Sequence, residues 1–322
     1  MESSPRFFQP QVGTLEDFSA FAVSSTEKHR GEFIEDQIFR DDELILDNLR
    51  RSAKYHQPGS PYKIERHRRM IAEFIASVLS DYAGSKRIDC RSCGYPCRCY
   101  EFPVHVLEQA MAYVDRFCEC KGKVSPASLQ LLACASLMVA CKARDHWAPT
   151  PNQLALYTNL GNSPQEIREF EKDLLRAMDF FTVTVIPSDF VTPLAERSNS
   201  ASLILEHLDD VYHYLSAVAM DQNCRKFCPA KLAVSAILHV VELHHPNTAE
   251  SFTGVLCAVA ELEEDSLRTS HQEVEEIAAR SMDTTTQRIV CKAAGPQLSL
   301  TKYVKKHRNG KNKSQGGSLQ SG

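Results

Sequence analysis

Apolar residues recur with a helical period through most of the middle of the chain. The clearest stripes run from Ile71 to Tyr82 and from Leu107 to Cys118, where apolar side chains return every three or four residues. Residues 129–140 are apolar on nearly every side, which is typical of a helix surrounded by other helices. Strand-like alternation is confined to residues 181–186, before Pro187, and we interpret it as a connector. The pattern predicts an all-α fold.

Capping signals and an internal similarity refine this prediction. Ser125-Pro126 is an N-cap followed by proline at the first helical position, and Ser163-Pro-Gln-Glu166 is a capping box. The sequence PASLQLLA, which begins at Pro126, resembles PAKLAVSA, which begins at Pro229. Each opens an apolar helix and follows an amphipathic one. Two similar helical domains are therefore expected in tandem.

The composition of the two ends differs from that of the middle. Residues 1–40 have no sustained period, and residues from 283 onward are rich in Lys, Asn, Gly, Ser and Gln. The expected division is a flexible N-terminal segment (1–40), a first domain with a preceding helix (41–182) and an insertion (85–102), a second domain (183–282) and a basic disordered tail (283–322).

Charge and hydropathy exclude several classes of protein. The longest uncharged stretch that is mainly apolar, Val124 to Cys141, is shorter than the roughly 20 residues of a membrane-spanning helix, so we expect no membrane association. The opening MESSPRFFQP lacks the pattern of a signal peptide, so an intracellular location with mostly reduced cysteines is expected. The net charge is −4, but after Thr284 there are eight Lys/Arg and no Asp/Glu, which leaves −12 for the rest. Direct binding of nucleic acid is not expected.

The basic tail and one cysteine-rich stretch are candidate functional segments. The tail carries a dense run of basic residues that fits nuclear import and predicts a protein of nucleus and cytoplasm: Lys302, Lys305, Lys306, Arg308, Lys311 and Lys313. Four thiolates of the insertion could hold a tetrahedral zinc ion: Cys90, Cys93, Cys97 and Cys99. The final Cys-x-Cys is short for chelation, so a redox-sensitive or merely exposed loop is the alternative, and no other cofactor is expected.

Four charged residues occupy positions where the helical pattern expects apolar ones. Asp115 and Glu171 lie on the inward stripes of their helices, Lys142 ends the apolar helix, and Arg68 lies one turn before Ile71. Burying a lone charge costs several kcal/mol, so each should find a partner or reach a surface that a ligand covers.

Several ordered segments resemble the cyclin family, and the D-type cyclins within it, over Leu44–Ser281. Arg68–Phe74 resembles the family's MRxIL…W opening, with Phe74 where tryptophan is usual. Further matching segments are Glu101–Phe117 (FPxAxxYxDRF in the family), Ser128–Lys142 (LQLxGxxxMxxASK), Tyr157–Leu175 (YTDxS…ELxxMExxLL) and Asp265–Glu276 (CLRxCQEQIEALL). The resemblance implies two tandem five-helix cyclin-box domains.

The resemblance also assigns roles to the anomalous charges. It implies that Arg68 and Asp115 pair inside the box, with Leu131 as the apolar member of the set, and that Lys142 and Glu171 bind the backbone of a cyclin-dependent kinase. The chain would then be a regulatory subunit that activates this Ser/Thr kinase in G1/S-like control of the cell cycle, and not itself an enzyme. We find no kinase Gly-rich loop, HRD or DFG motif.

The family's substrate-docking patch, through which kinase substrates and inhibitors bind, maps onto Met70, Ile71, Glu73, Phe74 and Gln130. The period also allows Ile71 and Phe74 to be core residues. Two other functions remain open: a double cyclin-fold transcription factor or adaptor that binds DNA or polymerase, which the charge of −12 disfavours, and a zinc- or thiol-dependent protein centred on Cys90–Cys99.

Overall fold

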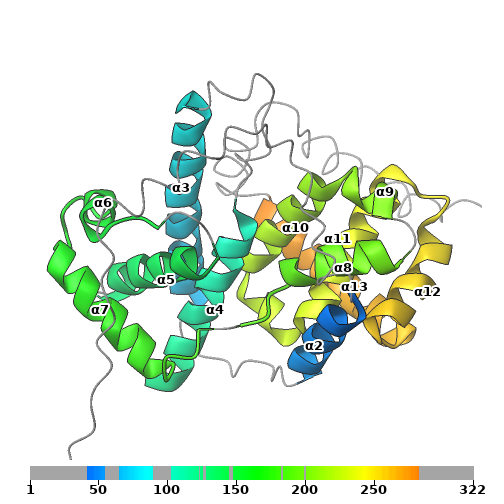
Figure 1. Cartoon of the computed structure of the whole chain (residues 1–322), viewed down its shortest axis with the longest axis horizontal. Coiled ribbons are helices and arrows are strands. Elements are labelled where there is room, and N and C mark those ends of the chain that lie inside the picture. Colours follow the sequence, from blue (N-terminus) through cyan, green and yellow to red (C-terminus); the bar gives the residue numbers. More distant parts are fainter. Residues whose placement is uncertain are drawn as a thin grey trace, which may run out of the picture. The chain divides into compact units, whose positions relative to one another are not determined.

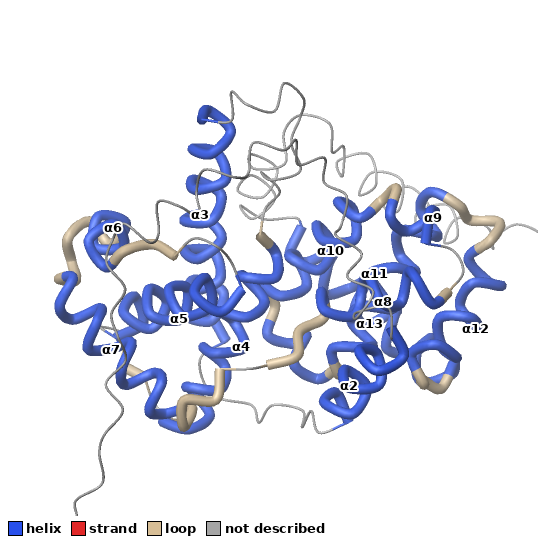
Figure 2. Tube along the Cα trace, viewed as in Figure 1, coloured by secondary structure: helices blue, strands red, loops and turns tan. Residues whose placement is uncertain are grey.

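The computed structural model describes residues 42–54, 65–89, 103–122, 124–125, 128–144, 148–182, 184–198 and 201–282. Within them every regular element is helical: the α-helices α2 to α13 and one 3₁₀ helix, η4 (Figures 1 and 2). The all-α prediction is therefore confirmed. None of the described helices combines the length and the apolar character needed to cross a lipid bilayer.

The first of two buried apolar clusters defines what we call the first lobe. Its helices are α3 (Glu65–Asp89), α4 (Val104–Lys121), α5 (Leu129–Arg144), α6 (Pro151–Tyr157) and α7 (Pro164–Ala177). Helix α5 is central, since it packs against α3, α4 and α7 (Figure 1). Every residue from Leu132 to Cys141 is buried, as its uniformly apolar sequence predicted.

The second buried cluster defines the second lobe in the same way. Its helices are α8 (Ser188–Arg197), α9 (Ala201–Leu205), α10 (Leu208–Met220), η4 (Gln222–Lys226), α11 (Pro229–His244), α12 (Ala249–Ala260) and α13 (Glu264–Met282). Helix α11 contacts α8, α10, α12 and α13, so it has the central place that α5 has in the first lobe. The two segments that resemble each other in sequence thus lead into the two central helices.

Helix α2 (Asp42–Lys54) packs differently from the sequence-based division, which grouped it with the first domain. Leu46 is 2% exposed and belongs to the apolar cluster of the second lobe, where α2 contacts α8 and α11. Because α2 precedes the first lobe in sequence, the expected division placed α2 with that lobe. In the structure, the apolar side of α2 is instead buried against the second lobe.

Local sequence signals explain where the helices begin. The Ser163 hydroxyl accepts a hydrogen bond from the Glu166 backbone N–H, and the Glu166 carboxylate accepts one from the Ser163 N–H, which completes the predicted capping box of α7. Thr150 and Gln153 form a second capping box, at the start of α6, which was not predicted from the sequence. The described residues of 181–186 form neither helix nor strand, so the interpretation as a connector is confirmed.

Candidate functional site

Arg68 of α3 and Asp115 of α4 form a bidentate ion pair. The Arg68 Nε and Nη2 atoms donate to the Asp115 Oδ1 and Oδ2 atoms at 2.8 and 3.0 Å. The Arg68 side chain is 2% exposed and that of Asp115 is 13% exposed. The carboxylate thus compensates a guanidinium that burial would otherwise make very costly.

The same arginine also reaches the second lobe. Its Nη1 atom donates to the Ala219 backbone oxygen at 2.9 Å, near the C-terminus of α10, where the helix dipole favours a cation. Arg225 of η4 approaches Asp115 as well, with 3.5 Å between Nε and Oδ2. Arg68 and Asp115 therefore fix the first two helices of the first lobe against the α10–η4 junction.

Lys142 and Glu171 meet at the surface, across the packed helices α5 and α7. The Lys142 Nζ atom lies 2.5 Å from Glu171 Oε1, and the side chains are 52% and 16% exposed respectively. Lys142 lies in the last turn of α5, where the helix dipole favours a cation. The four charges that broke the apolar pattern thus form two pairs, one buried and one at the surface.

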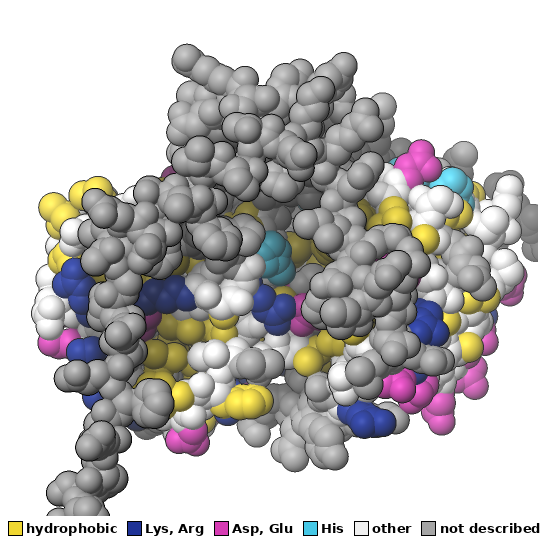
Figure 3. Space-filling view, viewed as in Figure 1, with side chains coloured by type: hydrophobic (Ala, Val, Ile, Leu, Met, Phe, Trp, Pro, Cys, Tyr) yellow, Lys and Arg dark blue, Asp and Glu magenta, His cyan; other side chains and the backbone are white. Residues whose placement is uncertain are grey.

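Apolar side chains adjoin basic ones on this face of the first lobe. Figure 3 shows apolar side chains, in yellow, beside Lys and Arg side chains, in dark blue, over α5 and α7. The exposed large apolar residues at the ends of α6 and α7 are Leu156, Tyr157, Leu160, Phe180 and Phe181. Leu131 is partly buried and packs against the first-lobe cluster. Charged groups beside exposed apolar ones are typical of a surface that binds a partner.

The residues assigned to the docking patch have different environments. Met70 is 56% exposed, whereas Ile71 is 3% exposed and belongs to the core. Phe74 is partly buried against that core. The Glu73 carboxylate accepts from Arg69 Nε at 3.0 Å, and the Gln130 side-chain oxygen accepts from Asn162 Nδ2 at 3.2 Å. Met70, Glu73, Phe74 and Gln130 therefore keep some exposure to solvent, whereas Ile71 does not.

Arg144 is a positioning residue that the sequence analysis did not identify. Its guanidinium forms a bidentate ion pair with Asp189 of α8, with N–O distances of 2.5 and 3.0 Å. It also donates to the Thr184 backbone oxygen and to the Gln109 side chain. Arg144 therefore joins α5, α4, the connector and α8 at one point.

Glu108 of α4 lies buried at the same junction. One carboxylate oxygen accepts from the Ser188 backbone N–H at 3.0 Å, while Oε1 has no hydrogen-bond partner among the described residues. Burial is the main reason that the pKa of Glu108 rises to about 7, and the Asp189 carboxylate adds to it, while the hydrogen bonds from Ser188 and the charge of Arg144 oppose it.

The raised pKa predicts how Glu108→Gln alters stability with pH. The folded state holds the Glu108 proton more tightly than the unfolded chain does. The contribution of Glu108 to the free energy of unfolding is therefore greatest below about pH 4.5 and falls as the pH rises toward 7. The amide keeps an acceptor for Ser188 but carries no charge. We expect Glu108→Gln to raise the free energy of unfolding by up to about 3 kcal/mol at pH 8 and by little at pH 4.5.

Urea unfolding at the two pH values measures this difference. Glu169→Gln, on the exposed face of α7, is the control and should show no such dependence. Equal effects of Glu108→Gln at both pH values would contradict the assignment.

Three buried cysteines are unsuited to nucleophilic chemistry. Burial raises the pKa of the Cys118 and Cys134 thiols to about 12 and that of Cys224 to about 11. Such thiols remain protonated at neutral pH. The predicted zinc ligands Cys90, Cys93, Cys97 and Cys99, and the basic run from Lys302 to Lys313, lie outside the described residues.

Comparisons with known proteins show which family this chain resembles. Residues 96–182 match the cyclin N-terminal domain. The chain is 25% identical to G1/S-specific cyclin-D3 of Bos taurus over 259 residues, which cover 76% of this chain and 81% of that protein. It is 25% identical to human G1/S-specific cyclin-D1 over 199 residues, 59% of this chain and 66% of that protein.

A solved structure supports the fold. The crystal structure of a viral cyclin from herpesvirus saimiri superposes with a TM-score of 0.60 at 16% identity and covers 74% of this chain and 97% of that one. The fold is therefore a cyclin fold, and the similarity to D-type cyclins expected from the motifs is confirmed.

Proposed function

We propose that this chain is a regulatory subunit that binds and activates a cyclin-dependent Ser/Thr kinase in G1/S-like control of the cell cycle. The observation that carries the proposal is the meeting of Lys142 and Glu171 at one surface point on α5 and α7, in a lobe that also exposes large apolar side chains. An ammonium and a carboxylate placed together can bond a carbonyl and an N–H group of one docked backbone. Such charge-assisted bonds are stronger than neutral ones.

In this mechanism the chain supplies no catalytic group. It holds the regulatory helix of the kinase so that the kinase's own Lys–Glu pair and magnesium-binding Asp are aligned. The buried Arg68–Asp115 pair and the Arg144–Asp189 pair keep the presenting helices rigid, so little ordering free energy is lost on binding.

The expected result with purified components follows from this division of roles. The isolated chain should transfer no phosphate to a protein substrate, whereas its addition to a cognate cyclin-dependent kinase should raise the kinase's activity by orders of magnitude. Affinity purification identifies the kinase, and labelled ATP measures the activity. Phosphate transfer by the isolated chain, or the absence of any such kinase among its partners, would contradict the proposal.

Two further roles belong to the same proposal. Kinase substrates and inhibitors dock at the patch of Met70, Glu73, Phe74 and Gln130, where phenylalanine in place of the family's tryptophan gives a shallower apolar surface. The basic residues from Lys302 to Lys313 import the protein into the nucleus, which gives a distribution between nucleus and cytoplasm.

A further inference from the structure

Three potential metal ligands converge where α11 and α13 pack together in the second lobe. The His271 Nε2 atom lies 3.6 Å from Glu242 Oε2 and 4.0 Å from Glu275 Oε1. One ligand atom from each of the three residues lies within 4.8 Å of the others. His271 and Glu275 are four residues apart and share one face of α13, while Glu242 comes from α11.

His271 is an unusual residue within this group. Its side chain is 13% exposed, and neither ring nitrogen has a hydrogen-bond partner among the described residues. A buried imidazole normally satisfies at least one nitrogen, because leaving it unpaired costs about 1–3 kcal/mol. Two carboxylates lie within ion-pair distance of His271 but too far for a hydrogen bond, so a small group can fit between the three side chains.

We propose that Glu242, His271 and Glu275 bind one Zn²⁺ ion. Donor atoms around a tetrahedral zinc ion with bonds of about 2.1 Å lie about 3.4 Å apart, so the observed distances need only a small contraction. The Glu242 side chain is 47% exposed and can change rotamer, and the Glu275 side chain, 33% exposed, can move the remaining few tenths of an ångström toward His271. Water completes the coordination.

Neighbouring groups support the ligands. His239 of α11 lies with its Nδ1 atom 3.2 Å from Glu275 Oε1 and orients this carboxylate as outer-shell residues do in metal sites. The His239 ring is itself fixed against Tyr214, with 4.4 Å between ring centroids. The two carboxylates supply oxygen ligands and negative charge that a divalent cation would neutralise.

The ligand chemistry favours zinc over magnesium and calcium. Mg²⁺ and Ca²⁺ prefer oxygen ligands alone, whereas an imidazole with carboxylates suits zinc. The bound ion would link the central helix α11 to α13, and binding to the folded state alone would stabilise the second lobe by mass action.

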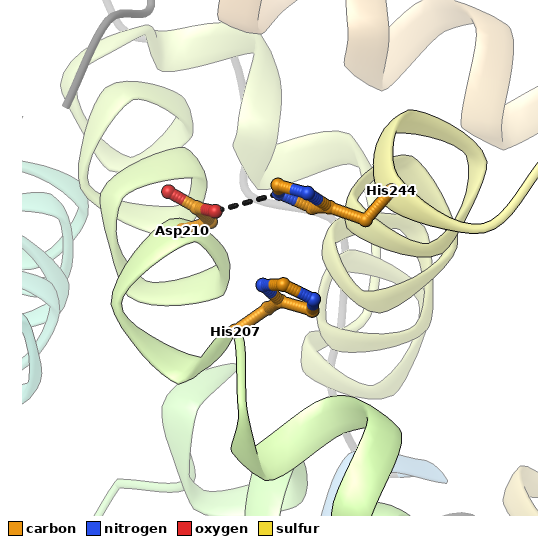
Figure 4. Close-up of side chains that lie close together, drawn as sticks. All are labelled: His207, Asp210 and His244. Carbon is orange, nitrogen blue, oxygen red and sulfur yellow. Dashed lines mark hydrogen bonds and ion pairs between the residues drawn. The ribbon is translucent and has the colours of Figure 1, made fainter.

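A second group of ligand-type residues, His207, Asp210 and His244, serves as a comparison (Figure 4). The rings of His207 and His244 are stacked with 3.9 Å between centroids and 5° between planes, and His244 already pairs with Asp210 at 2.8 Å. An ion between parallel rings would face their π surfaces and not the in-plane lone pairs. These residues therefore do not form a metal site as they stand, and His244→Ala is a matched control.

In the experiment, the full chain is stripped of metal and then equilibrated with Zn²⁺. Elemental mass spectrometry measures the bound zinc per chain, and competition with a chromophoric chelator measures the affinity. The melting temperature is recorded with and without Zn²⁺. The cysteine-rich segment can bind zinc separately, so the readout is the difference between variants. Relative to the parent, His271→Ala and Glu242→Gln should each lose one equivalent or bind it at least tenfold more weakly, with a smaller zinc-induced rise in melting temperature.

His244→Ala should bind as the parent does. Because Glu242 is largely exposed, Glu242→Gln should fold even if His271→Ala does not, and circular dichroism checks both. Parent-like stoichiometry and affinity in a folded Glu242→Gln variant, or loss of the equivalent in His244→Ala alone, would overturn the proposal. The measurement needs no kinase, so its outcome is independent of the proposed regulatory function.

Discussion

Replacing Lys142 or Glu171 by alanine is expected to weaken binding of the kinase by more than tenfold while leaving the fold nearly as stable as before. In the complex, each truncation leaves carbonyl or N–H groups of the docked backbone unpaired and desolvated, which costs about 2 to 5 kcal/mol. In the free protein the two side chains form an ion pair with Lys142 52% exposed, and such pairs contribute about 1 kcal/mol or less. Calorimetric affinity and urea unfolding of each variant separate the two quantities.

A charge exchange distinguishes direct contact from an internal role. Lys142→Glu combined with Glu171→Lys can restore an ion pair between α5 and α7, but it places each charge opposite the wrong group of the partner. If the residues contact the kinase, the double variant binds as weakly as the alanine variants. If their ion pair acts only within the chain, the exchange recovers affinity and the proposed contact is wrong.

Another ion pair on α7 supplies the control. Asp173 and Arg176 are 59% and 65% exposed and pair at 3.1 Å. Asp173 lies two residues from Glu171, about 200° around the helix, so Asp173→Ala changes the charge of α7 on another side. It should leave kinase affinity within about twofold of the parent. Parent-like affinity of Lys142→Ala and Glu171→Ala would refute the central contact of the proposed function.

Most of the fold could be predicted from the helical pattern, because the apolar period of a helix depends only on the residues of that helix. The stripes around Ile71 and Leu107 and the uniformly apolar run of α5 lie where the sequence predicted, since each helix needs only its own apolar face to be recognised. The anomalous charges were visible for the same reason. A charge on an apolar face is unusual whatever its partner, so the sequence marked Arg68, Asp115, Lys142 and Glu171 without the structure.

The partners of the charged residues depend on packing between elements distant in sequence. Arg144 pairs with Asp189, and Arg68 reaches the Ala219 carbonyl, 151 residues away. Periodicity within one helix holds no information on such contacts. Likewise, Glu108 belongs to no local motif, and its raised pKa arises from burial at the junction of α4 with the start of α8. The packing of α2 against the second lobe also depends on contacts between residues far apart in sequence.

Asp115→Ala is expected to act in the opposite way to the Lys142 and Glu171 variants, by lowering stability directly. The substitution removes both carboxylate acceptors from a guanidinium that is 2% exposed and leaves Arg225 without this nearby charge. Breaking one side of a buried pair costs about 3–5 kcal/mol, because the remaining charge is uncompensated. For a folded region of this size, that corresponds to a fall in melting temperature of roughly 10 °C.

Two comparison variants show whether charge or packing is responsible for that fall. Asp115→Asn keeps the shape and one acceptor oxygen, so it should be destabilised less than Asp115→Ala yet still clearly, since the amide cannot neutralise Arg68. Glu264→Ala breaks the exposed Arg268–Glu264 pair, whose side chains are 54% and 45% exposed, and should change stability by less than about 1 kcal/mol. A loss for Asp115→Ala as small as that for Glu264→Ala would mean that water reaches Arg68, because only a hydrated guanidinium tolerates removal of its counter-ion.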